Sequence, residues 1–113
     1  MHEISIMSSV IETCKKEAEK FNSNKVTKIS LQVGEKSGAF LDSLRFAFEA
    51  ISPNTIAEQA ILDIEVIPFY GECTMCGLKF HSPEGYLLCQ ECGGFAKLIS
   101  GRELNINFIE VEK

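Results

Sequence analysis

Four cysteines in two pairs are the part of this sequence with the clearest chemical meaning. The four residues are Cys73, Cys76, Cys89 and Cys92. Two thiolates in Cys-x-x-Cys spacing reach one ion through a tight turn, and a second pair completes a tetrahedron with Zn–S distances of about 2.3 Å. Gly77 and Gly93 directly follow the pairs, where they permit positive φ and leave backbone N–H groups free to bond the thiolates. The spacing predicts a structural zinc site with no open position for a catalytic water.

Other uses of the cysteines fit the sequence less well. A redox dithiol needs a Cys-x-x-Cys pair at a helix N-terminus after a strand, where the thiol pKa is depressed, and neither pair has that setting. His81 follows Cys76 closely and is an alternative zinc ligand, although a lone histidine in a polar loop is more often solvated. An odd total of five cysteines suits a disulfide framework poorly. The remaining one, Cys14, falls on an apolar helical stripe and is expected in the core.

The first three residues, Met1, His2 and Glu3, carry donors for a second metal ion. The α-amine of Met1, the backbone nitrogen of His2 and the His2 imidazole can close adjoining chelate rings, and Glu3 adds a carboxylate or a further amide nitrogen. A flat set of nitrogen and oxygen donors suits nickel(II) or copper(II) better than zinc. Taken alone, three such residues are more often an ordinary chain start, so both interpretations stay open at this point.

Composition narrows the functional class. With 113 residues, 45% of them hydrophobic and 24% charged, the chain has room for one core and a small appendage. There is no apolar run of about 20 residues and no secretory signal pattern, so we expect a cytoplasmic protein without a membrane partner. A net charge of -5 argues against nucleic acid as a partner.

An enzyme is not expected from the motifs. The loop from Gly34 to Gly38 lacks the G-x-x-x-x-G-K-[ST] pattern of a phosphate-binding loop. No pairing of a nucleophile with a base is evident either. A zinc-ribbon module that binds protein or nucleic acid, with no transferable metal ion, therefore stays open as one function of the chain.

Hydrophobic periodicity predicts the elements that position these residues. Apolar residues at three- and four-residue intervals indicate helices, and strict alternation indicates strands. The expected elements are a helix over residues 5–21, a strand over 26–33, a helix over 40–51, a strand over 57–67 and a last strand after residue 101. The segment 70–100 has too few large apolar residues for its own core and needs a metal to fold.

These elements predict an α+β fold. We expect a small antiparallel or mixed three-stranded sheet with two helices, and a four-cysteine zinc ribbon inserted before the last strand. The predicted domains are a nickel-binding α+β domain of residues 1–69 and 102–113 and a zinc-ribbon domain of residues 70–101. The sequence does not fix the oligomeric state, and a homodimer stays open.

Several short segments match one family. They are Met1–Ser5, Ile29–Gly34, Leu44–Glu49 and Thr55–Glu58, and the paired cysteines follow them. With these segments in this order, the chain resembles the HypA/HybF family of hydrogenase nickel-incorporation proteins over nearly its whole length.

The resemblance implies a nickel metallochaperone that delivers Ni(II) to the large-subunit precursor of [NiFe] hydrogenase and works with a HypB-type GTPase. His2 carries over as the principal nickel ligand, with the Met1 amine and Glu3 as supporting donors. The four paired cysteines carry over as ligands of structural Zn2+. Urease maturation proteins are further partners of relatives that have an acidic residue before the second helix; here Phe40 takes that place, and Asp42 lies close by.

The zinc ribbon is expected to be a rigid platform that recognises the GTPase or the hydrogenase subunit. Its expected surface residues are Lys79, Phe80, His81, Tyr86 and Phe95. Relatives that place a histidine beside each cysteine pair can alter their zinc shell by protonation. Glycine and leucine flank the pairs here, so a pH-switching zinc site is not expected.

Overall fold

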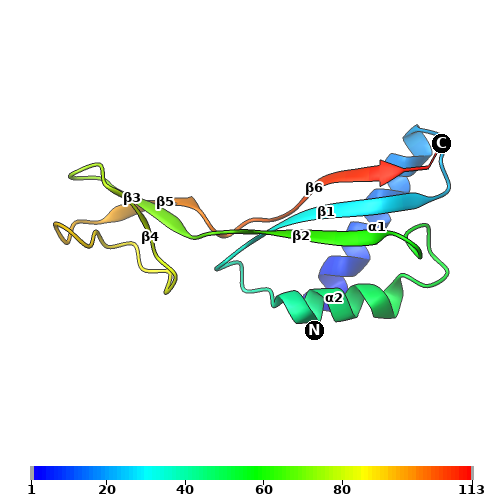
Figure 1. Ribbon diagram of the computed structural model, residues 1–113, viewed down its shortest axis with the longest axis horizontal. Coiled ribbons are helices and arrows are strands. Elements are labelled where there is room, and N and C mark those ends of the chain that lie inside the picture. The colour runs from blue at the N-terminus through cyan, green and yellow to red at the C-terminus, as the bar shows by residue number, and fades with distance from the viewer. Residues whose placement is uncertain (1, 113) are drawn as a thin grey trace. The chain divides into compact units, whose positions relative to one another are not determined.

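The computed structural model describes residues 2–112, and of residue 2 the backbone alone. The elements in chain order are α1 (His2–Lys20), β1 (Val26–Gly34), α2 (Leu41–Ile51), β2 (Ile61–Ile67), β3 (Tyr70–Cys73), β4 (Lys79–His81), β5 (Ala96–Ser100) and β6 (Leu104–Val111). They form two three-stranded sheets, with strand orders β2-β1-β6 and β4-β3-β5 (Figure 1). The predicted α+β architecture of two helices, a small sheet and an inserted ribbon is confirmed. Within residues 2–112, neither helix has the length and apolarity to cross a bilayer.

The chain forms two compact units. The helical unit comprises Met1–Leu31, Ala39–Glu65 and Asn105–Lys113, and the ribbon unit comprises Gln32–Gly38 and Val66–Leu104. The ribbon unit therefore includes the turn that follows β1, which the sequence had no reason to group with the cysteines. A functional division into a nickel-binding and a zinc-binding domain stays a prediction.

The core of the helical unit is built from the predicted apolar stripes. In α1, Met7, Cys14 and Ala18 are fully buried, and α2 contributes the buried Leu44 and Phe48. The two helices pack against each other and lie along one side of the β2-β1-β6 sheet (Figure 1). The larger of these side chains, Met7, Leu44 and Phe48, each contribute about 1.5–3 kcal/mol when buried, relative to an exposed position. The helices therefore need no metal to hold their place in this unit.

The strand β2 begins at Ile61, four residues later than predicted. Residues 53–59 form turns instead, because their side chains bond nearby backbone groups. The Thr55 hydroxyl donates to the carbonyl of Ser52 at 2.6 Å, and the backbone N–H of Asn54 donates to the carboxylate of Glu58 at 3.0 Å. Such local bonds compete with a strand ladder.

The ribbon unit depends on a close backbone approach at Gly101. Its φ of 114° lies in a region that favours glycine, and a Cβ there would lie 2.3 Å from the Cα of Phe69. The Gly101 carbonyl accepts the backbone N–H of Lys36 at 2.7 Å, and the N–H of Gly34 donates to the carbonyl of Glu103 at 2.7 Å. These bonds hold the turn after β1 against the chain that follows β5.

We predict that Gly101→Ala destabilises the protein far more than Gly38→Ala. Both residues have positive φ, 114° and 88°, so both variants lose about 1 kcal/mol to backbone strain. An added Cβ at Gly38 meets nothing within 4 Å, whereas at Gly101 it overlaps the backbone of Phe69. We expect a loss of at least about 3 kcal/mol for Gly101→Ala in denaturant unfolding. Equal losses in the two variants would contradict the close approach.

Candidate metal centre

The four paired cysteines converge on one point in the ribbon unit. Their sulfur atoms all lie within 4.8 Å of one another. The Sγ–Sγ distances are 3.5 Å for Cys73 and Cys92, 3.7 Å for Cys76 and Cys89, and 3.9 Å for Cys76 and Cys92. Within residues 2–112 this is the one cluster of three or more metal-ligating side chains of this kind.

These separations fit a tetrahedral zinc ion. Sulfurs at about 2.3 Å from a common ion, at tetrahedral angles, lie about 3.8 Å from one another. The observed values scatter around that figure and far exceed the S–S bond length of about 2.05 Å in a disulfide. All four cysteines are accordingly free thiols, as is the buried Cys14. The donor set fits a structural zinc ion and leaves no side-chain position for a substrate.

The two cysteine pairs are held by the same backbone pattern. In the first, the N–H of Cys73 donates to the carbonyl of Leu78 at 2.8 Å, and the N–H of Gly77 donates back to Cys73 at 3.1 Å. The second repeats this with Cys89, Gly94 and Gly93, at 2.8 and 3.0 Å. Gly77 and Gly93 have φ of 80° and 75°, as the sequence predicted. Neither pair lies at a helix N-terminus, so the setting of a redox dithiol is absent from this part of the chain.

Backbone N–H groups make the first cysteine of each pair the better thiolate. The N–H groups of Cys76 and Met75 bond the Cys73 sulfur at 3.4 and 3.3 Å and lower the pKa of Cys73 to about 6. At Cys76 the Leu78 N–H acts in the same direction, but the neighbouring sulfurs outweigh it and raise the pKa to about 12. Four adjacent sulfurs cannot all carry charge unaided, whereas a divalent cation at their centre stabilises all four thiolates.

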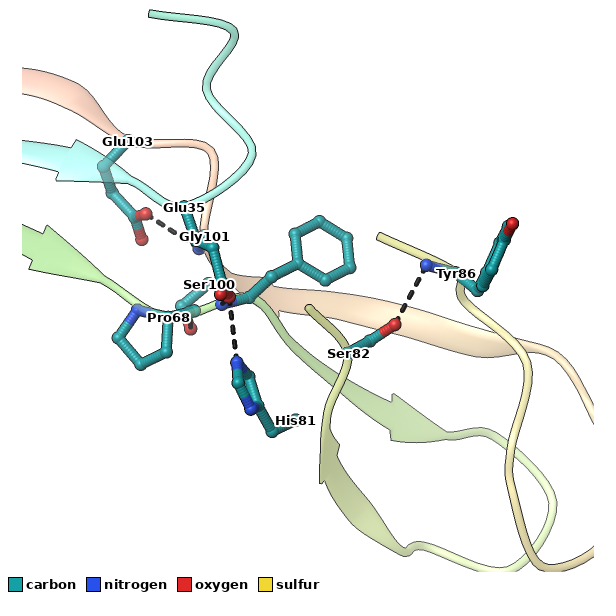
Figure 2. A network of polar contacts seen from close by, with 9 residues as sticks. Glu35, Pro68, His81, Ser82, Tyr86, Ser100, Gly101 and Glu103 are labelled. Atoms are coloured by element: carbon teal, nitrogen blue, oxygen red, sulfur yellow. Dashed lines mark hydrogen bonds and ion pairs between the residues drawn. The ribbon is translucent and has the colours of Figure 1, made fainter. Parts of the chain in front are cut away.

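His81 lies outside the cysteine cluster and has another partner. Its Nε2 lies 2.9 Å from Oε1 of Glu35 (Figure 2), and its ring centroid is 5.5 Å from that of Tyr70. The same Oε1 atom accepts the backbone N–H of Phe69 at 2.8 Å. Since an ionised carboxylate only accepts hydrogen bonds, Nε2 of His81 is the protonated ring nitrogen in this contact. His81 as an alternative zinc ligand is therefore wrong.

Glu35 connects the turn after β1 to the ribbon strands through these two hydrogen bonds. The Phe69 N–H and the His81 imidazole together hold the pKa of Glu35 below its usual value. The turn is further fixed by the Glu35 N–H, which donates to the carbonyl of Ile67 at 2.8 Å. This connection needs no metal. Sequence reasoning missed it because Glu35 and His81 are 46 positions apart and neither belongs to a motif.

The predicted nickel ligands lie at the start of α1. Met1 and the side chain of His2 fall outside the described residues, while the backbone of His2 begins the helix. Glu3 lies in the first turn and is half-buried. It lines a hollow of about 200 Å³ in the helical unit together with Asp42, which lies in the first turn of α2. The fold thus brings a second carboxylate to the start of the chain.

The chain is similar to one family throughout. Residues 1–111 match the family described as "Hydrogenase/urease nickel incorporation, metallochaperone, hypA". A "Hydrogenase maturation factor HypA" of Geobacter metallireducens is 40% identical over 113 residues, covering 99% of this chain and all of that protein. The protein of the same name from Dehalococcoides mccartyi is also 40% identical, with 99% and 95% of the two chains covered.

Two solved structures have the same fold. One is the solution structure of the Ni metallochaperone HypA from Helicobacter pylori, with a TM-score of 0.69, 27% identity and 96% of each chain covered. The other is a solution structure of a HypA protein, with a TM-score of 0.73, 28% identity and coverage of 99% and 97%.

We predict that the ribbon unit depends on the cysteine cluster, whereas the helical unit does not. Cys73→Ser should lower the zinc content of the purified protein to near zero and disrupt the β4-β3-β5 sheet. The helical signal in circular dichroism should persist, because both helices belong to the helical unit. As a matched control, Cys14→Ala should retain zinc. Loss of helix in step with zinc, on chelation or in Cys73→Ser, would contradict this separation.

We also predict that Glu35→Gln destabilises the protein at neutral pH. The pKa of Glu35 in the folded state lies below its usual value, so its carboxylate stabilises the folded state above the unfolded-state pKa and ceases to do so as the pH falls through the folded-state pKa. The difference in unfolding midpoint between wild type and Glu35→Gln should therefore shrink on acidification. Zinc content is measured in parallel. Glu84→Gln, at an exposed glutamate of the same unit, should match wild type throughout.

Proposed function

Because the chain belongs to the HypA family of hydrogenase/urease nickel-incorporation metallochaperones, we propose that it delivers Ni(II) to the large-subunit precursor of [NiFe] hydrogenase. The ion is its cargo, and no reaction of its own is required. We place this transfer in the cytoplasm, in company with a HypB-type GTPase. Urease maturation proteins are a second proposed set of partners, since the family description also names urease. The observation that carries the proposal is a helix that begins at the second residue of the chain.

A helix start at His2 supports nickel binding there. The first four backbone N–H groups of an α-helix have no acceptor within the helix. The amide nitrogens of His2 and Glu3 are therefore not needed for hydrogen bonds within the helix and can serve as ligands of a metal ion. Together with the Met1 amine and the His2 imidazole they form a flat set of nitrogen donors, which suits nickel(II).

Carboxylates at the same place offset an electrostatic cost. The N-terminal end of a helix carries partial positive charge, which disfavours a bound cation. Glu3 and Asp42 line one hollow from the first turns of the two helices, so two negative charges lie near the chain start. We propose Glu3 as a supporting ligand and Asp42 as a further carboxylate that stabilises the bound ion.

The cysteine cluster has a different task in this proposal. Cys73, Cys76, Cys89 and Cys92 hold a zinc ion that keeps the ribbon unit folded, and this ion is not transferred. The ribbon then presents exposed rings, among them Tyr86 and Phe95, which are 68% and 78% exposed, to a protein partner. The expectation that Phe80 belongs to this surface was wrong, because its side chain is 7% exposed and packs with the cysteines.

We predict that nickel binding needs the start of the chain. Untagged protein should bind Ni(II) in calorimetric titration, whereas His2→Ala, and protein with residues added before Met1, should bind at least about tenfold more weakly. Asp42→Asn should weaken nickel binding less, because its carboxylate is a supporting group in the proposed site. Zinc content should be the same in all four proteins.

Two controls sharpen this test. Glu49→Gln changes another glutamate of the helical unit, outside the hollow, and should bind nickel as wild type does. The rival function, a zinc-ribbon interaction module, predicts unchanged binding to hydrogenase precursor in every variant and no nickel transfer. Nickel uptake that survives an extension before Met1 would rule out the proposed site.

A further inference from the structure

The four cysteines of the metal centre differ in their exposure. Cys73 and Cys89 are 3% and 4% exposed and pack with Phe80 in the small core of the ribbon. Cys76 and Cys92, by contrast, are exposed. Each pair thus contributes one buried and one exposed cysteine, and the sulfurs of the two exposed cysteines lie 3.9 Å apart.

The two exposed cysteines lie in exposed turns. Residues 74–79 and 90–93 are all exposed, whereas Cys73 closes β3 and is paired with Ala96 of β5. A disulfide requires the two sulfurs to approach from 3.9 Å to about 2.05 Å. Movement of these turns can supply that approach without displacing the strands.

From this geometry we propose that Cys76 and Cys92 are a peroxide-reactive modification site, which converts to a Cys76–Cys92 disulfide and thereby disables the metal centre. This inference does not rest on nickel delivery.

One molecule of hydrogen peroxide is sufficient to oxidise the two cysteines to a disulfide. One exposed thiolate attacks a peroxide oxygen, the O–O bond breaks, and the products are a sulfenic acid and hydroxide. The other exposed thiolate then attacks the sulfenic sulfur and expels a second hydroxide as the S–S bond forms. Two cysteines are oxidised by two electrons in total, and hydrogen peroxide is reduced. Since two of four thiolates are lost as donors, the remaining pair no longer holds zinc firmly.

Peroxide treatment of the zinc-loaded full chain tests this site. Hydrogen peroxide is added at increasing ratio, remaining thiols are alkylated, and peptides are mapped without reduction while a chromogenic chelator follows free zinc. We expect Cys76 and Cys92 to lose their thiols about tenfold faster than Cys73 and Cys89. A peptide pair joined through Cys76 and Cys92 should appear in step with zinc release, and a thiol reductant with added zinc should reverse both.

Two variants exclude oxidation of other sulfur-containing side chains as the cause of zinc release, and neither variant removes a zinc ligand. Met75→Leu eliminates an exposed thioether that peroxide also oxidises, and Cys14→Ala eliminates the fifth thiol; both should release zinc as wild type does. A disulfide within one pair, such as Cys73–Cys76, would overturn the proposal. So would equal loss of all four thiols, or zinc release that disappears in Met75→Leu.

Discussion

The attraction between four thiolates and one divalent cation is the constraint on which the ribbon unit depends. The buried residues around the sulfurs are few: Cys73, Phe80 and Cys89, with the partly buried Ala96 packed against them. Even with the buried Phe69 added, so small a core offsets only part of the conformational entropy of ordering residues 66–104. Binding free energy at such a site is folding free energy, because the unfolded chain has no preformed site. The repeated backbone pattern around Cys73 and Cys89 therefore serves to aim sulfurs and contributes little burial of its own.

Hydrogen bonds to the Glu35 carboxylate stabilise the part of the ribbon unit that does not contact the cysteine cluster. This carboxylate accepts bonds from Phe69 and His81 on one oxygen atom, and the backbone beside it joins residues 67 and 101. The glycine at position 101 permits this because any larger side chain would overlap Phe69. One end of the unit thus depends on thiolate coordination and the other on a carboxylate, so the two ends respond to different solution conditions.

Regular patterns in the sequence predicted the parts of the structure that depend on neighbouring residues. The stripe through Met7 and Cys14 gives α1, and the Cys-x-x-Cys spacing gives the cluster, because both follow from short-range geometry. The start of β2 was misplaced because hydrogen bonds of Thr55 outweigh an alternating pattern. The burial of Phe80 and the contact between Glu35 and His81 were missed, since both arise only when the β4-β3-β5 sheet brings distant residues together. His2 was put forward from its donor chemistry, but the choice of a nickel ligand over an ordinary chain start came from family resemblance, which no periodicity supplies.

If the chain binds nickel as proposed, its two metal sites distinguish zinc from nickel by the chemistry of their ligands and not by overall affinity. Divalent ions of this series differ in affinity in a fixed order, so a site selects among them chiefly through ligand type and geometry. Four thiolates held by turns that end in glycine favour a tetrahedral ion, and with the shell complete no position remains through which nickel can enter. In the proposed nickel site, the start of α1 supplies nitrogen donors beside the carboxylates of Glu3 and Asp42, a donor set that suits nickel. Retention of zinc and release of nickel thus depend on two different backbone environments: a turn that ends in glycine and the first turn of a helix.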